Sequence, residues 1–368
     1  MKRRELLGAL AGAAAATTLT ACGSSEDNAQ AAAQMQPQKT YKWKMVTTWP
    51  KNFPGLGTGA NNIAKLITEM SGGRIDVKVY GAGELVGAFE VFDAVSQGNA
   101  QLGHAGAYYW KGKIPAAPFF SAVPFGLTAQ EMNAWLQYGG GLELWREAYK
   151  PFGLIANPGG NSGTQMGGWF NKEINSLADL KGLKMRIPGF GGEVLKRAGG
   201  VPVTLPGGEI FPSMQSGALD ATEWVGPYND LAFGLYKAAK YYYTPGWHEP
   251  GTTMECMINE QAYNELPADL QSIVTNAIKV ANADMLSEYT ARNQQALQTL
   301  INEHNVQLRD FPDDVLRELK KLSEQVVEEA AQADPFAAKV WASQKAFRKQ
   351  VTQWTQNSEQ KFLEAREL

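Results

Sequence analysis

The chain has 368 residues, of which 44% are hydrophobic and 19% are charged, and its formal net charge at pH 7 is −3. Because both signs of charge are interspersed, the composition gives no reason to expect nucleic acid or a lipid surface as a partner. About 330 residues follow the N-terminal segment, which is enough for two lobes and long for one compact core.

Residues 1–22 predict an export signal. Basic residues at positions 2–4 precede an Ala-rich apolar stretch, Leu6 to Leu19, that is too short to span a bilayer, and the small residues of LTAC end at Cys22. This order resembles a bacterial lipoprotein signal, in which Cys22 becomes the acylated first residue. The Arg3-Arg4 pair also resembles a twin-arginine signal, although Glu5 departs from its usual order, so the Sec and twin-arginine routes both stay open.

Residues 23–39 contain almost nothing to bury and predict a flexible tether. No later stretch approaches the roughly 18 apolar residues of a spanning helix, so we expect a periplasmic, extracytoplasmic protein held only by the lipid at Cys22. If Cys22 is acylated, Cys256 has no disulfide partner. Its place in the apolar run 254–258 predicts a small buried residue.

The first half of the mature chain alternates strands and helices. Alternating apolar residues predict strands at 41–47 and 75–79, with a helix at about 57–70 between them. This order implies a parallel pair with a right-handed crossover. A helix at about 89–97 leads into the apolar run 101–105.

The order then repeats, with expected strands at 153–156, 165–170, 183–187 and 201–205 and helices near 193–198 and 210–216. Segments 96–110 and 215–230 are built alike: each ends a helix, turns at a glycine, forms a brief strand and opens into an aromatic-rich loop. Ligands of doubly wound sheets bind at the carboxyl ends of strands. Two lobes of similar construction would therefore each present such a loop at the carboxyl end of a strand.

From Pro267 onward the pattern predicts helices: one to about Asn302, one that starts at Asp313, and a last one with an apolar stripe that packs on the lobes or pairs with a second copy. With the family resemblance described below, these patterns imply a two-lobed α/β protein with a ligand cleft between the lobes, a long connecting helix and a helical C-terminal extension. Its expected parts are the signal 1–22, the tether 23–39, lobe I at 40–160 plus 251–290, lobe II at 161–250 plus 291–334, and a C-terminal helix at 335–368.

Common catalytic motifs are missing. His104, His248 and His304 are far apart and lack metal-ligand spacing, which argues against a zinc site or a histidine-assisted nucleophile. The sequence has no G-x-S-x-G elbow, no P-loop and no complete G-x-G-x-x-G. An enzyme would have to work with carboxylates alone.

Polar residues stand at successive expected strand ends beside Gly or Pro, namely Gln165, Arg186, Glu223 with Trp224, and Glu249. An arginine there can clamp a carboxylate through two parallel N–H donors, which implies an anionic ligand. The glutamates would repel that ligand unless a hard cation such as Ca²⁺ or Na⁺ accepts oxygens from both. Aromatic residues in the same loops could wall the pocket: Tyr108, Tyr109, Trp110, Phe190, Trp224, Tyr228 and Trp247.

At these residues the chain resembles the extracytoplasmic solute-binding proteins of tripartite ATP-independent periplasmic (TRAP) transporters, the DctP-like family. The most specific markers are GLKMRIPG and FPSMQSGALDATEWVGPYND. The resemblance implies that Arg186 grips the substrate carboxylate. The common family asparagine is replaced by Glu223-Trp224, which with Gln165 and WHEPG resembles the branch, often labelled mannitol/chloroaromatic type, that binds 2-oxo or 2-hydroxy monocarboxylates through a metal ion.

By this resemblance Glu223, Gln165, Glu249 and the backbone oxygen of Trp224 would hold Na⁺ or Ca²⁺. Substrate contacts besides Arg186 would come from Gln165 and Trp224, from Tyr108 or its neighbour Tyr109, from Tyr228 or Asn229, and from Phe190. The ligand would be pyruvate, lactate or a similar acid, passed without catalysis to TRAP membrane subunits that read lobe closure. Two alternatives stay open. One is another organic acid or a polyol bound without metal, and the other is an exported glycoside hydrolase that uses Glu223 and Glu249 but gives Arg186 no role.

Overall fold

The structure is a computed structural model that describes residues 39–368, and residues 40–368 form one compact unit. The unit contains two six-stranded sheets. The predicted signal and tether, including Cys22, lie outside the described residues except for Lys39. Among residues 39–368 we find no helix whose length and hydropathy would let it cross a bilayer.

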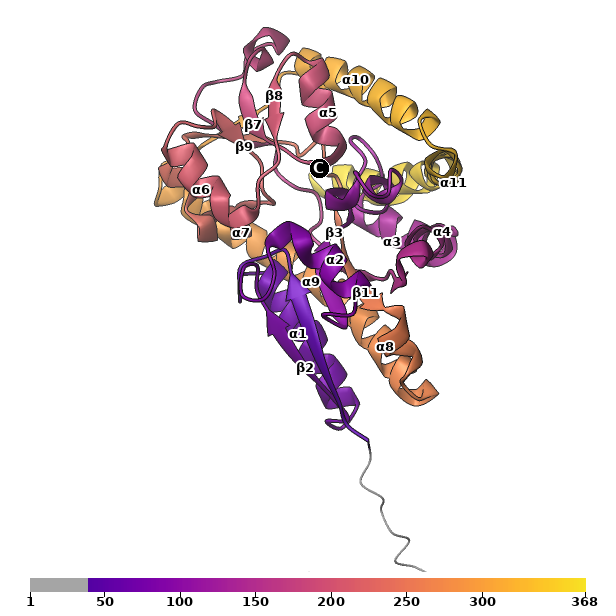
Figure 1. Ribbon diagram of the computed structural model, residues 1–368. Helices are drawn as coiled ribbons and strands as arrows, with labels where there is room; N and C mark the ends of the chain where they lie inside the picture. Colours follow the sequence, from indigo (N-terminus) through magenta and orange to yellow (C-terminus); the bar gives the residue numbers. More distant parts are fainter. Residues whose placement is uncertain (1–38) are drawn as a thin grey trace, which may run out of the picture. The chain divides into compact units, whose positions relative to one another are not determined.

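The first sheet has the order β2-β1-β3-β11-β4, with β5 also paired to β11. Strands β1 and β2 are parallel and are joined by α1, and β3 is parallel to β1, as the alternating pattern predicts. Strand β11 returns late in the chain and lies antiparallel beside β3 (Figure 1). The strands are β1 (Tyr41–Thr47), β2 (Ile75–Tyr80), β3 (Leu102–Gly106), β4 (Leu154–Ile155), β5 (Pro158–Asn161) and β11 (Thr253–Asn259).

The second sheet has the order β12-β10-β6-β9-β7-β8. Within it β7 is parallel to both β8 and β9, so these three strands end at one edge. The sequence pattern did not predict β10, a run of tyrosines without alternation, or β12, a mostly polar edge strand. The strands are β6 (Gly168–Phe170), β7 (Lys184–Arg186), β8 (Val201–Val203), β9 (Ala221–Thr222), β10 (Tyr241–Thr244) and β12 (Gln307–Asp310).

Helices cover both sheets, and the longest is α9, which begins after Pro267 and ends at Asn302 as predicted. It packs on α1 and β5 from the first sheet's part of the chain and on α7 from the second's. The helices are α1 (Leu56–Met70), α2 (Val91–Ser96), α3 (Ala129–Tyr138), α4 (Gly141–Tyr149), α5 (Gly189–Arg197), α6 (Gly207–Gln215), α7 (Pro227–Phe233), α8 (Glu260–Asn264), α9 (Ala268–Asn302), α10 (Asp313–Gln332), α11 (Pro335–Thr355) and α12 (Lys361–Arg366).

The C-terminal extension is not one uninterrupted helix. A π-helical turn over Gln356–Gln360 separates α11 from α12. Helix α10 packs on α5, whereas α11 packs on α10, α3 and α4 (Figure 1). The two-sheet α/β fold and the helical extension are therefore confirmed, while the exact lobe boundaries stay a prediction.

Two buried polar or reactive side chains in the first sheet are structural. Cys256 is fully buried on β11, as expected, and burial raises the pKa of its thiol. His104 on β3 accepts a hydrogen bond from Trp49 Nε1 at 2.7 Å and its Nε2 lies 3.2 Å from the Gly159 carbonyl oxygen. Burial lowers the pKa of His104 to about 4, so this imidazole is neutral at pH 7.

Candidate functional site

Arg186 and Glu223 meet at the carboxyl edge of the second sheet. Arg186 is the last residue of β7 and is in register with Thr222, the last residue of the parallel strand β9, so Glu223 follows at the same edge. The prediction from strand ends is confirmed in position. The two side chains do not project into an open loop, however, because Arg186 is 1% exposed and Glu223 is fully buried.

The Arg186 guanidinium is held on three sides. Its Nη1 donates to the carboxylate and to the backbone oxygen of Glu223, its Nε donates to the Leu205 carbonyl at 3.2 Å, and its Nη2 donates to the Tyr109 hydroxyl at 3.2 Å. These contacts use four of the five N–H donors of an arginine. One Nη2–H has no partner among residues 39–368, and the bidentate grip on a carboxylate stays a prediction.

The charges of this pair are stabilised by each other. Desolvation, the largest single effect, works to lower the pKa of Arg186, but the Glu223 carboxylate together with Tyr109, Tyr108 and Glu249 outweighs it and the pKa is raised. The Trp224 ring lies under the guanidinium, whose central carbon is 5.1 Å from the ring centroid. Trp49 and Phe53 pack edge-on against that indole and fix its orientation.

Gln165 and Glu249 form the second part of the site, on the two segments that connect the sheets. The backbones of these segments hydrogen-bond to each other, from Ser162 N to Thr252 O at 3.0 Å and from Gln165 N to Glu249 O at 3.1 Å. Glu249 Oε2 accepts from Gln165 Nε2 at 2.8 Å and from Thr252 Oγ1 at 2.7 Å. Burial, followed by the nearby Glu223, raises the pKa of Glu249 to about 7.

His248 completes a cluster with Glu223 and Glu249. Its Nε2 lies 3.3 Å from Glu223 Oε2, and one potential ligand atom from each of the three buried residues lies within 4.8 Å of the others. The sequence reasoning missed His248 because it asked only whether histidines were near one another. The available signal was its position next to Glu249 in WHEPG.

Helix α5 approaches His248 closely because of a glycine. A Cβ on Gly191 would lie 2.9 Å from the His248 Cβ, so a larger residue would push the histidine. The GFGG run also explains why α5 was expected to begin only near residue 193, since glycine is a poor helix former. In the structure α5 begins at Gly189.

Tyr108 and Tyr109 lie together at the site. They are on a 3₁₀ turn (Ala107–Trp110) after β3, so the expectation that neighbours face opposite ways on a strand does not apply, and their ring centroids are 4.6 Å apart. Tyr109 contacts Arg186, while burial, followed by the Glu249 charge, raises the pKa of Tyr108. Phe190 is buried edge-on against Phe119.

Tyr228 and Asn229 are engaged elsewhere. The Tyr228 hydroxyl donates to Glu288 on α9 at 3.0 Å. Asn229 donates to the Pro54 carbonyl at 2.7 Å and accepts from the Tyr289 hydroxyl at 2.7 Å. Instead of lying free for a ligand, as the sequence led us to expect, these side chains connect α7 to α9 and to the start of α1.

Unsatisfied polar atoms concentrate in this cluster. Within residues 39–368, seven buried side-chain nitrogen or oxygen atoms have no hydrogen-bond partner, and three of them are Gln165 Oε1, Trp224 Nε1 and His248 Nδ1. Buried polar groups are normally satisfied, so each such atom needs an explanation. An acceptor, a donor and an imidazole nitrogen left open at one buried site suit a small polar ligand together with a cation.

Comparison with known proteins identifies the family. The family model for bacterial extracellular solute-binding protein, family 7, matches residues 45–334. A monocarboxylate 2-oxoacid-binding periplasmic protein of Nostoc sp. strain PCC 7120 is 44% identical over 359 residues, which cover 98% of this chain and 97% of that protein.

Solved structures agree in fold over 89% of this chain. A TRAP periplasmic solute-binding protein from Pseudoalteromonas atlantica T6c with bound sodium and pyruvate is 46% identical, with 99% of that chain covered and a TM-score of 0.86. One from Colwellia psychrerythraea with bound calcium and pyruvate is 45% identical, with 100% covered and a TM-score of 0.86. One from Bordetella bronchiseptica RB50 with calcium and picolinate is 37% identical, with 97% covered and a TM-score of 0.87. The chain belongs to the bacterial extracellular solute-binding proteins of family 7.

Proposed function

We propose that this chain is the extracytoplasmic binding subunit of a TRAP transporter that captures a small 2-oxo monocarboxylate, with pyruvate as the first candidate, together with Na⁺ or Ca²⁺. The observation that carries the proposal is the buried Arg186–Glu223–Glu249 cluster with its unsatisfied atoms. Relatives of 46% and 45% identity hold pyruvate with sodium and with calcium. The chain carries out binding and no bond chemistry.

The donor atoms suit a hard cation. Glu223 and Glu249 offer carboxylate oxygens, and Gln165 Oε1 is a buried acceptor without a donor. Ca²⁺ and Na⁺ accept such oxygens, together with backbone oxygens such as that of Trp224. When bound, the cation would supply the positive charge that lets a carboxylate ligand approach two glutamates. His248 in this reading orients Glu223 and does not itself bind the ion.

The substrate side of the proposal rests on Arg186. Its remaining Nη2–H can donate to one carboxylate oxygen, and the Trp224 Nε1–H is a second donor without a partner. Tyr108, Tyr109 and Phe190 would enclose the small apolar part of the ligand. Because Tyr109 follows a strand of the first sheet and Arg186 ends one of the second, their contact joins the two parts in a closed form.

The remaining expectations belong to the same proposal. Acylation of Cys22, export by the Sec or twin-arginine route, and pairing of two copies through residues 335–368 all remain proposals, as do the lobe boundaries 40–160 plus 251–290 and 161–250 plus 291–334. The hydrolase alternative is disfavoured because Arg186 and His248 already contact the Glu223 carboxylate, which therefore is not poised as an acid or base.

The test is a thermal unfolding screen of the purified chain with pyruvate, longer 2-oxo acids, lactate, mannitol and aromatic acids, before and after chelation and sodium exchange. A ligand that binds only the folded state adds about 2.7 kcal/mol of stability at one hundred times its Kd. We expect the stabilisation by oxo acids to vanish without metal and to return with Na⁺ or Ca²⁺. Stabilisation that is indifferent to metal would remove Gln165, Glu223 and Glu249 from the cation role.

A matched pair of variants locates the ion. Gln165→Met removes the buried acceptor while keeping the side-chain size, and Gln325→Met makes the same change at an exposed position of α10. We expect Gln165→Met to weaken metal-dependent pyruvate binding by at least about tenfold, and Gln325→Met to leave it unchanged. Equal binding by the two variants would contradict the assignment of Gln165.

A further inference from the structure

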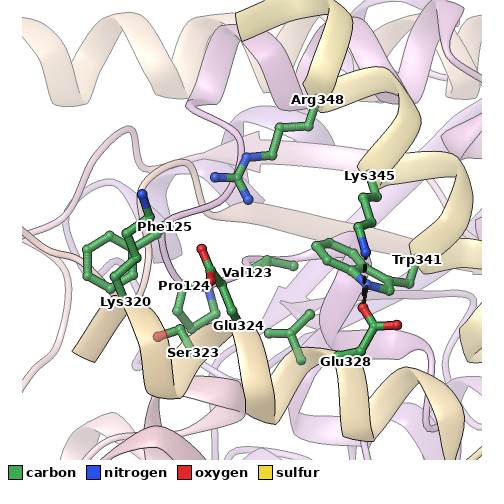
Figure 2. Close-up of a pocket in the computed structure, with 11 residues that line it drawn as sticks. Val123, Pro124, Phe125, Lys320, Ser323, Glu324, Glu328, Trp341, Lys345 and Arg348 are labelled. Atoms are coloured by element: carbon green, nitrogen blue, oxygen red, sulfur yellow. Dashed lines mark hydrogen bonds and ion pairs between the residues drawn. The ribbon is translucent and has the colours of Figure 1, made fainter. Parts of the chain in front are cut away.

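A cavity of about 270 Å³ lies where α10, α11 and residues 123–125 meet, and it shares no lining residue with the Glu223 cluster (Figure 2). Its apolar walls are the buried Val123, Pro124 and Val327 and the partly buried rings of Phe125 and Trp341. Helix α10 packs on α5 of the second sheet's part, whereas α11 packs on α3 and α4. The cavity therefore lies between elements that belong to different parts of the fold.

The charges around this cavity are unbalanced. Glu328 accepts from Trp341 Nε1 at 3.0 Å and from Lys345 Nζ at 3.2 Å, and these two contacts lower its pKa, so it is matched with Lys345. Among residues 39–368, neither Lys320, Glu324 nor Arg348 has a side-chain hydrogen bond or ion pair. Figure 2 shows the Arg348 guanidinium directed into the cavity. Lys320 and Arg348 are thus unpaired cations beside one unpaired acid, Glu324. The cavity therefore carries an excess positive charge next to its apolar wall.

Phe125, one of the two aromatic residues of the cavity wall, has an unusual backbone conformation. Phe125 has a φ of 53°, in the left-handed region that a bulky side chain rarely adopts. Its backbone N–H donates to the Trp247 carbonyl at 2.8 Å, and its ring is stacked on Trp247 with centroids 6.0 Å apart. Strained residues of this kind collect at functional positions. Trp247, the residue before His248, thus holds Phe125 in place.

We propose that this cavity is a second ligand site, one for an aromatic monocarboxylate. The ring would lie against Phe125 and Trp341, and the carboxylate would pair with Arg348, whose fork of N–H donors matches two carboxylate oxygens, and with Lys320. The volume is slightly below the roughly 300 Å³ at which pockets for drug-sized ligands begin, so it suits a one-ring acid.

Benzoate and its neutral isostere benzamide test the charge requirement. We would titrate each by calorimetry into the full chain, alone and saturated with pyruvate. Benzoate should bind in both conditions, and benzamide should bind about tenfold more weakly or not at all. Arg348→Gln should weaken benzoate binding about tenfold. The matched control Arg317→Gln changes an exposed arginine of α10 that pairs with Asp313, and it should leave benzoate binding unchanged.

The proposal would be overturned if benzoate and benzamide bound alike, if Arg348→Gln bound benzoate as the parent chain does, or if pyruvate displaced benzoate, which would place benzoate at Arg186. Failure of benzoate to bind at all would also reject it. A thermal unfolding curve establishes that Arg348→Gln is folded. If pyruvate itself does not bind, the comparison of Arg348→Gln with Arg317→Gln still decides the second site, independently of the proposed transport function.

Discussion

Replacing Arg186 by methionine should strongly destabilise the folded chain. The change removes the ion pair with Glu223, the hydrogen bonds to Leu205 and Tyr109, and the cation–π contact with Trp224. Glu223 would then be a fully buried carboxylate beside His248 alone. Removing one partner of a buried ion pair costs about 3–5 kcal/mol, because the other charge is left uncompensated. This is a large part of the roughly 5–15 kcal/mol that stabilises a typical domain.

The assay is urea unfolding at pH 7 without metal or ligand, followed by tryptophan fluorescence, for Arg186→Met, Glu223→Gln and the double variant. We expect the double variant to lose at least about 2 kcal/mol less than the sum of the two single losses, because residues in one network couple by up to about 3 kcal/mol. Additive losses, or a loss below about 1 kcal/mol in either single variant, would show that the pair does not form in the ligand-free protein and would refute this reasoning.

Two further predictions test local packing and charge. Gly207→Ala places a Cβ 2.6 Å from the Trp224 ring and should weaken pyruvate binding severalfold, whereas Gly208→Ala meets nothing within 4 Å and should bind normally; equal affinities by calorimetry would exclude Trp224 as a wall. Burial raises the pKa of Glu255 to about 7, so the folded state keeps a proton that the unfolded chain releases above about pH 4.5. Glu255 should therefore contribute a fall in stability of on the order of 3 kcal/mol as pH rises from 4.5 to 7. In urea titrations at each pH, Glu255→Gln should reduce the pH dependence by about that amount, while the fall due to the similarly raised pKa values of Asp230 and Glu249 should remain.

The sequence predicted the part of the site that follows from strand topology. Arg186 and Glu223 end or follow parallel strands, so their position at one sheet edge required only the correct order of elements. Gln165 and Glu249 were recognisable from their glycine and proline neighbours. The direct pairing of Arg186 with Glu223 was not predictable, because it depends on side-chain orientation within a buried space.

Other site features depend on tertiary approach and carry little local signal. Tyr109 contacts Arg186 because residues 107–110 form a 3₁₀ turn and not a strand. In the sequence Arg348 is one of many polar residues of an amphipathic helix, and its place at the cavity depends on the packing of α10 against α11. Tyr228 and Asn229 had suitable chemistry, but they hydrogen-bond to residues of α9 that follow them by 60 positions in the sequence.

The paired connections between the sheets have a mechanical consequence. Gln165 and Glu249 are on the two short segments by which the chain passes from one sheet to the other, and those segments are hydrogen-bonded side by side. If the halves rotate about these segments, the side chains on them lie nearest the rotation axis and move least. An ion held there would move little during this rotation. The Arg186–Tyr109 contact, which lies away from the rotation axis, would break when the halves open and re-form when they close.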